Sequence, residues 1–260
     1  MENLKDKVAV ITGGSSGIGK ATTIELAKAG CKVVLFAKTK QKLLDAFNEI
    51  KTFTEEVTAV VCDVRNYDSV EKAFLGIIKK YNTVDILVNC AGIAIRRSFK
   101  STSIEEAKDI MGTNFFGTVN CIKAVLPAMT RNNSGAIVNI GSLAGIIALP
   151  DLSFYSASKF AIVGLSEALH YELKQYNIQV SLINPAATNT NIFSNESWQN
   201  FPHEKRHPKL LAPEEVAVAI VDAINSNKFE VTIPYFTKLK LSGKSFFPSI
   251  YRWYINKLPR

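Results

Sequence analysis

A tyrosine and a lysine four residues apart form the clearest chemical pattern in the sequence. Tyr155 and Lys159 are the only tyrosine–lysine pair with this spacing, and on a helix the spacing places both side chains on one face. A phenol with a pKa of about 10 is a poor acid or base at neutral pH. A neighbouring ammonium stabilises the phenolate and lowers that pKa. We therefore expect Tyr155 to exchange a proton with a substrate oxygen.

Two polar residues upstream are candidates for the same site. Ser142 follows a predicted strand, Ala136–Ile140, and parallel sheets bind ligands at the carboxyl ends of their strands. Ser142 could therefore hydrogen-bond the substrate oxygen and orient it. Asn114 lies in a stretch predicted to be one long helix, Ile104–Met129. The structural alternatives are a strand-end cap for Ser142 and local helix bonding for Asn114, but the order of all four residues favours one catalytic site.

A glycine-rich turn joins the first predicted strand, Lys7–Thr12, to the first predicted helix, Ile18–Lys28. Glycines let backbone N–H groups approach a pyrophosphate, and a helix N-terminus adds a favourable partial charge. The alternative is an ordinary turn, but the placement between strand and helix favours a dinucleotide site. The expected cofactor contacts in this turn are Gly13, Ser15, Ser16, Gly17, Ile18 and Gly19.

Strands and helices alternate along the whole chain. Besides the first and the fifth strand, strands are predicted at Lys32–Phe36, Val57–Val61, Val84–Val88, Ile178–Ile183 and Phe229–Ile233, and further helices at Lys40–Lys51, Ser153–Tyr176 and Pro213–Ser226. The strands are continuous apolar runs, as is typical of strands buried on both faces. The alternation predicts an α/β fold, a doubly wound parallel sheet with helices on both faces. A chain of 260 residues with 47% hydrophobic content fits one such domain.

Taken together, these motifs resemble those of the short-chain dehydrogenase/reductase family. The glycine turn has the spacing G-x-x-x-G-x-G, and the run from Asn89 to Gly92 is similar to the family's Asn-Asn-Ala-Gly, with Cys90 as a departure. The resemblance covers about residues 5–235. It implies a single Rossmann-type domain and an oxidoreductase that interconverts a carbonyl and a secondary alcohol with a nicotinamide dinucleotide.

The resemblance also implies roles for single residues. Asn114 would hold a water that relays protons to Lys159, Lys159 would also bind the nicotinamide ribose, and Asp63 would contact the adenine ring. After the sixth strand the family has Pro-Gly and then a threonine that touches the nicotinamide carboxamide; here Ala186 replaces the glycine. The remaining cofactor contacts implied are Val64, Asn89, Ala91, Gly92, Tyr155, Pro185, Thr188 and Thr190.

The end of the second strand bears on the choice of cofactor. NAD-selective enzymes carry an acidic residue there for the ribose 2′-hydroxyl. This chain has no carboxylate between Phe36 and Lys40, and Lys38 could pair with a 2′-phosphate. We therefore expect NADP(H) rather than NAD(H). The alternative is that Lys38 and Lys40 are the solvated start of a helix.

The sequence indicates only the chemical class of the substrate. Residues 143–152, beside Ser142, are largely apolar, and residues 185–212 are the expected substrate lid. This favours a hydrophobic ketone or alcohol such as a lipid, steroid or retinoid. One alternative is a 3-oxoacyl-carrier reductase of the same fold. Another is a redox-inactive dinucleotide-binding scaffold, which the complete set of four catalytic candidates disfavours.

The net charge of +8 is concentrated near the end of the chain. Residues 228–260 hold seven basic side chains and one acidic one, and residues 236–260 form a basic, aromatic tail. Such a tail is compatible with peripheral membrane contact. Packing over the substrate site or at the interface of a homo-oligomer, the assembly common among relatives, explains its aromatics equally well. No motif indicates nucleic-acid binding.

Several other signals are interpreted as structural. The four cysteines form no C-x-x-C pair, which favours reduced thiols in a reducing, cytoplasmic setting. No signal-peptide pattern and no run of about 18 apolar residues occurs. Residues 203–207 match the zinc motif H-E-x-x-H, but Pro202 and Pro208 bracket them, so no metal site is expected. The pair Arg96 and Arg97 either meets an acidic substrate group or is solvent-exposed, the latter being the commoner case.

Overall fold

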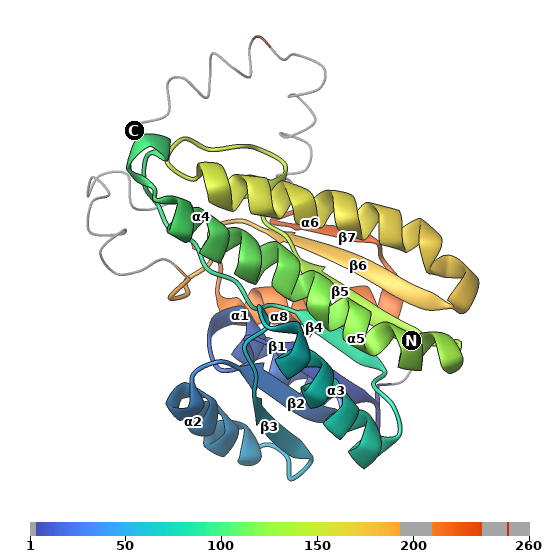
Figure 1. Cartoon of the computed structure of the whole chain (residues 1–260). Helices are drawn as coiled ribbons and strands as arrows, with labels where there is room; N and C mark the ends of the chain where they lie inside the picture. The colour runs from blue at the N-terminus through green and yellow to red at the C-terminus, as the bar shows by residue number, and fades with distance from the viewer. Residues whose placement is uncertain (1–3, 193–209, 236–248, 250–260) are drawn as a thin grey trace.

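A parallel sheet of seven strands, in the order β3-β2-β1-β4-β5-β6-β7, forms the centre of the protein (Figure 1). The computed structural model describes residues 4–192, 210–235 and Ser249. The strands are β1 (Val8–Thr12), β2 (Lys32–Ala37), β3 (Val57–Val61), β4 (Ile86–Asn89), β5 (Gly135–Ile140), β6 (Ile178–Pro185) and β7 (Glu230–Ile233). Every neighbouring pair is parallel.

The strand order reverses direction between β1 and β4. These strands pair in a register that sets Thr12 opposite Asn89, so the glycine turn after β1 and the turn after β4 leave the sheet side by side. A reversal of this kind is where doubly wound sheets bind their ligands. The predicted fold class is confirmed.

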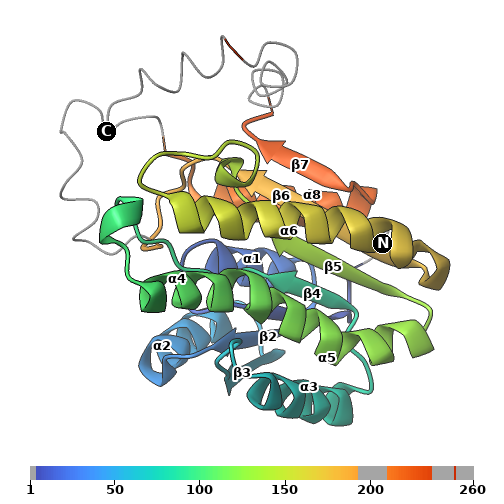
Figure 2. The same cartoon turned by 45° about the horizontal axis from the view of Figure 1, so that its top comes forward.

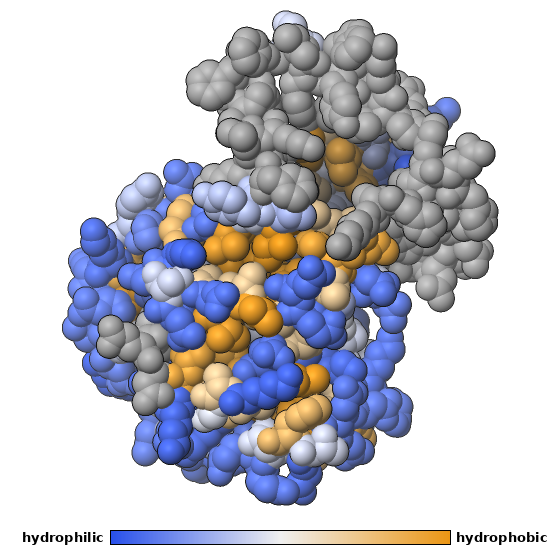
Figure 3. Space-filling model, turned by 180° about the vertical axis from the view of Figure 1, so that it is seen from behind, coloured by the Kyte–Doolittle hydropathy of each residue, from blue (hydrophilic) through white to orange (hydrophobic). Residues whose placement is uncertain are grey.

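Helices cover both faces of the sheet (Figures 1 and 2). One layer contains α1 (Gly17–Lys28), α2 (Lys40–Lys51) and α8 (Pro213–Ser226), and the other contains α3 (Tyr67–Tyr81), α5 (Gly117–Arg131) and α6 (Ser153–Glu172). Between each layer and the sheet lies a separate apolar core, which is why β1, β4 and β5 are buried along their whole length. Seen from behind, the outer surface is mostly polar, with apolar residues gathered in a central band (Figure 3).

The predicted helix over residues 104–129 is interrupted in the structure. It consists of α4 (Ile104–Met111), a π-helical turn (Gly112–Phe116) and α5. A π turn accommodates one extra residue and often occurs at functional sites. Here it contains Asn114, whose side chain bonds to the backbone of Ile93. This contact with a residue far away in the chain is the physical reason for the difference.

Smaller differences concern the ends of several elements, among them β6, which ends at Pro185, two residues later than predicted. β4 begins at Ile86, two residues later than predicted, and α6 ends at Glu172, followed by a 3-10 turn, Lys174–Tyr176. Residues 186–192 and 210–212 of the predicted lid are described, and a β-bridge joins Thr188 to Leu211. Residues 193–209 and the tail beyond 235, apart from Ser249, lie outside the described residues. In the described part of the chain no helix has the length and apolarity to cross a membrane.

Candidate active site

Tyr155 lies in the first turn of α6, beside the carboxyl end of β5. Its side chain is 8% exposed and packs against Ala94 and Ala144. Ser142, which follows β5, is close enough to Tyr155 for its side chain to lower the pKa of the phenol. The Ser142 hydroxyl also accepts a hydrogen bond from Ala144 N at 3.1 Å, which fixes its orientation. The predicted serine and tyrosine are therefore neighbours.

Lys159 lies one turn further along α6, on the same side as Tyr155. Its Nζ is 5.8 Å from the centre of the Tyr155 ring and donates a hydrogen bond to Ile140 O at 2.7 Å. The side chain is 5% exposed, and this burial lowers the pKa of Lys159 to about 8. The shared helix face predicted from the spacing of the two residues is present.

The pKa of Tyr155 differs from the sequence-based expectation. Burial is the strongest influence and raises the pKa, while the side chain of Ser142 offsets part of that rise. The expectation that Lys159 lowers the pKa of Tyr155 below its ordinary value is therefore wrong for the protein without a bound ligand. The physical reason is that removal of water from the phenolate outweighs the stabilisation it receives. A raised pKa keeps Tyr155 protonated at neutral pH, the form that donates a proton.

Asn114 completes the polar cluster from the π turn. Its Oδ1 accepts a hydrogen bond from Ile93 N at 2.8 Å, and its Nδ2 donates to Ile93 O and to Ser158 Oγ at 3.0 and 2.9 Å. A side chain at Gly92 would begin 3.3 Å from Asn114 Oδ1 and 4.0 Å from Lys159 Nζ. The four predicted catalytic residues thus meet at one place. Ser158, fully buried between them, was not predicted.

The glycine turn leaves the start of α1 open to an anion. Gly13 has a φ of +66°, and a Cβ there would lie 3.0 Å from the backbone of Ala91, so any side chain would press against the turn after β4. At the N-cap, Ser16 makes no side-chain hydrogen bond to the first turn, and that turn has no acidic residue. The N–H groups at the start of a helix lack partners within the helix. These features fit the phosphates of a dinucleotide.

The other predicted residues of the turn lie around this helix start. Ser15 precedes the N-cap, Ile18 packs on the core beneath it, and a Cβ at Gly19 would overlap Gly13 O. A Cβ at Gly17 would lie 3.0 Å from Thr190 Cγ2, so Thr190 lies next to Gly17 at the helix start. A cavity of about 270 Å³ lies between α1, this segment and the start of α8. Pro185 ends β6, and the Thr188 hydroxyl donates to Ala186 O at 2.9 Å.

A threonine that was not predicted, Thr12, joins the end of β1 to the turn after β4. Thr12 Oγ1 accepts hydrogen bonds from Cys90 N and Ala91 N at 3.0 and 3.1 Å. Asn89, in contrast, points into the protein, where its Nδ2 donates to Asn139 Oδ1 at 2.9 Å. Its side chain therefore holds the sheet together, and any contact with a cofactor would come through its backbone.

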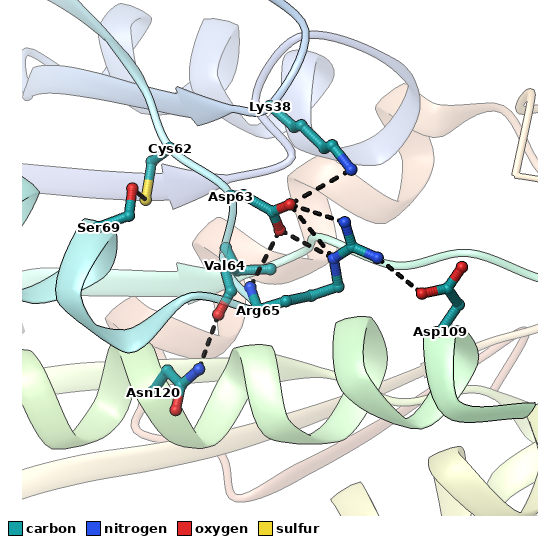
Figure 4. Close-up of polar contacts among 8 residues, drawn as sticks. All are labelled: Lys38, Cys62, Asp63, Val64, Arg65, Ser69, Asp109 and Asn120. Atoms are coloured by element: carbon teal, nitrogen blue, oxygen red, sulfur yellow. Dashed lines mark hydrogen bonds and ion pairs between the residues drawn. The ribbon is translucent and has the colours of Figure 1, made fainter. Parts of the chain in front are cut away.

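The third strand carries a charged cluster at its carboxyl end (Figure 4). Asp63 pairs with Lys38 at 3.3 Å and with Arg65 at 2.8 Å, and Arg65 also reaches Asp109 on α4 at 2.7 Å. Hydrogen bonds from Arg65 lower the pKa of Asp63 to about 2. Val64 packs against Gly117 and accepts a hydrogen bond from Asn120. The predicted Lys38 and Asp63 thus lie together, with Arg65 as a second basic residue that was not predicted.

Comparison with known proteins identifies the family of this chain. The sequence model of a family described as short chain dehydrogenase matches residues 7–200. The chain belongs to the short-chain dehydrogenase/reductase (SDR) family. It is therefore an oxidoreductase of the predicted class, acting between CH–OH and C=O.

Two relatives of this chain have similar names. The 3-ketodihydrosphingosine reductase of Bos taurus is 37% identical over 228 residues, covering 84% of this chain and 68% of the relative. The 3-dehydrosphinganine reductase of Danio rerio is 37% identical over 231 residues, with the same shares covered.

Solved SDR structures resemble the fold. One from Burkholderia phymatum, in complex with NAD, has a TM-score of 0.86 and 25% identity over 96% of this chain and 97% of that chain. A 3-ketoacyl-(acyl-carrier-protein) reductase from Brucella melitensis, complexed with NADH, has a TM-score of 0.79 and 28% identity over 89% of this chain and 98% of that chain. Nicotinamide dinucleotides are thus the cofactors of SDR neighbours.

The remaining signals of this SDR are structural where they are described. All four cysteines are unpaired, and burial raises the pKa of Cys90 to about 12, which makes its thiol a poor nucleophile. Arg97 pairs with Glu106 at 2.6 Å. The H-E-x-x-H run lies outside the described residues, and within them no three His, Cys, Asp or Glu side chains gather as metal ligands.

Proposed function

We propose that this SDR is an NADP(H)-dependent reductase of a long-chain ketone of the 3-ketodihydrosphingosine type. The observation that carries the proposal is a buried, protonated Tyr155 beside Ser142 and Lys159, in an apolar corner at the carboxyl end of β5. The names of the relatives from Bos taurus and Danio rerio supply the substrate class.

The chain's residues would divide the chemistry as follows. Ser142 and Tyr155 would hydrogen-bond the ketone oxygen, and Tyr155 would donate its proton to that oxygen as the alcohol forms. Lys159, charged below a pKa of about 8, would stabilise the phenolate that develops on Tyr155. The bound nicotinamide would supply the hydride. Asn114 would hold a water through which Lys159 and Tyr155 recover the proton.

The preference for NADP(H) rests on the charges at the ends of β2 and β3. Lys38 is 64% exposed and Arg65 is 34% exposed in their side chains, and they flank the carboxylate of Asp63. An acidic residue that would bind a 2′-hydroxyl is absent from the end of β2. The cluster is balanced, with Lys38 and Arg65 against Asp63 and Asp109, so the preference rests on the exposed ammonium of Lys38, which could pair with a 2′-phosphate.

The apolar surroundings of Tyr155 support a hydrophobic substrate. Ala94, Ala144, Leu152 and Ile192 pack around Tyr155. A sugar or a small polyol would leave hydroxyl groups without partners against these side chains, which is costly. An alkyl chain has no such cost and gains from its own burial.

A second candidate is the reduction of a 3-oxoacyl group on a carrier protein. The structural likeness to the Brucella melitensis reductase favours it. Both reactions use the same four catalytic residues, so only the substrate separates them. A redox-inactive dinucleotide-binding scaffold is disfavoured, because such a protein needs no proton donor next to the dinucleotide.

A panel of substrates with both cofactors tests the proposal. The purified chain is assayed in detergent with 3-ketodihydrosphingosine, a 3-oxoacyl thioester and a small polyol, each with NADPH and NADH. We expect the highest kcat/KM for the long-chain amino ketone with NADPH. A preference for the thioester would favour the second candidate, and a preference for polyols or for NADH would contradict the proposal.

A further inference from the structure

The segment of residues 93–104, here called the rim loop, exposes large apolar side chains. It connects the turn after β4 to the start of α4 and contains a 3-10 turn, Phe99–Ser101. Phe99 is 68% exposed and Ile104 is 62% exposed. The Phe99 ring stacks on Phe154 with centroids 5.3 Å apart, so the aromatic side chain is held outward by a defined contact.

The rim loop begins beside the catalytic residues. Ala94 belongs to the apolar cluster around Tyr155, and its N–H donates to Ile192 O at 3.2 Å. Further along, Arg97 N donates to Asp151 O at 2.8 Å, just before α6 begins. The segment before α4 therefore lies at the end of the molecule where α4 and α6 both start (Figures 1 and 2).

The basic residues of the rim loop are Arg96, Arg97 and Lys100, and residues 93–104 contain no acidic residue. Arg97 is paired with Glu106 of α4, whereas Lys100 is exposed next to Phe99. Exposed apolar side chains next to basic ones are the combination that binds the interface of an anionic bilayer. A symmetric pair of chains joined through this loop would instead set its basic side chains against each other, which is unfavourable.

We propose that the rim loop docks on an anionic membrane surface, with Phe99 and Ile104 entering the interface and Lys100 facing the lipid headgroups. The inference rests on the proposed function, because a long-chain ketone resides in a bilayer. Docking at the rim loop brings the catalytic site to that bilayer, so the ketone passes to Tyr155 without crossing water.

Vesicle sedimentation with the full chain tests this surface. The probe is vesicles of phosphatidylcholine with and without phosphatidylserine. We expect the double variant Phe99→Ser, Ile104→Ser to bind the phosphatidylserine vesicles about 100-fold more weakly or worse, because burial of each of the two side chains contributes on the order of 1–2 tenfold steps in affinity. The matched control is Leu75→Ser on α3, which is 61% exposed and should bind as the unaltered chain does.

Three results would overturn the proposal. These are an unaltered chain that does not bind the vesicles, a double variant that binds as well as the unaltered chain, and an equal loss of binding in Leu75→Ser. The second of these, if it comes with a loss of dimers, would assign the loop to contact with a second copy of the chain. Ketone reduction in detergent is measured separately, because its absence contradicts the proposed function and its presence does not depend on docking.

Discussion

Lys159 Nζ lies 5.8 Å from the centre of the Tyr155 ring and donates its hydrogen bond to Ile140 O. The ammonium is therefore anchored to the end of β5 and faces the phenol as a nearby charge. Because both groups are buried, the pKa of Tyr155 is raised and that of Lys159 is lowered to about 8. At neutral pH this gives a neutral proton donor beside a positive charge, the arrangement that carbonyl reduction needs.

The pH dependence of reduction should report Lys159. Its pKa of about 8 means that the ammonium is present below this pH and is lost as the pH rises through it. We expect kcat/KM for ketone reduction to fall above about pH 8, because the phenolate forming on Tyr155 then has no stabilising charge. In Lys159→Arg the side chain keeps its charge in this range, so the residual activity should lack this fall. A fall at the same pH in both proteins would assign it to another group.

Removal of Lys38 should weaken NADPH binding selectively. We expect Lys38→Ala to raise the KM for NADPH about tenfold or more, since a charge-assisted hydrogen bond to phosphate contributes about 1.5–3 kcal/mol. The KM for NADH should be unchanged, because Arg65 continues to hold Asp63. The matched control is Lys40→Ala, an exposed lysine at the start of α2. Equal effects on both cofactors, or in both variants, would show that Lys38 does not recognise the 2′-phosphate.

A buried polar chain should contribute to stability and fix α6 on the sheet. Asn139 Nδ2 donates to Ser166 Oγ at 3.0 Å, and Ser166 in turn donates to Ile162 O, with Asn139 and Ser166 fully buried. Ser166→Ala leaves the Asn139 amide without that acceptor, so we expect the free energy of unfolding to fall by about 1–3 kcal/mol. Urea denaturation measures this. The exposed Ser153→Ala on the same helix serves as the control, and an equal change in both would contradict the assigned role.

Much of the fold could be predicted because its signals are local. Continuous apolar runs identify strands buried on both faces, and the spacing of Tyr155 and Lys159 is a property of one helix. The glycine turn could be recognised for the same reason, since its function depends on residues that follow one another between Thr12 and Gly19. Ser142 and Asn114 were found through their order in the chain.

The features that could not be predicted depend on contacts between distant segments. The π turn at Asn114 requires Ile93, 21 residues away, and Thr12 acquires its role only because β1 pairs with β4. The direction of the Tyr155 pKa shift depends on how deeply the site is buried. Arg65 is different, because it lies two residues from Asp63 and a basic residue at that position was visible in the sequence.

Single-turnover reduction of 3-ketodihydrosphingosine by NADPH, compared between the unaltered chain and Tyr155→Phe, tests the central proposal most directly. We predict that the variant, which keeps the ring and loses only the hydroxyl, reduces the ketone about 10²–10⁴-fold more slowly. The affinity for NADPH, followed by its fluorescence, should stay nearly unchanged. Near-normal reduction by Tyr155→Phe would contradict the account, because the proton would then come from another group.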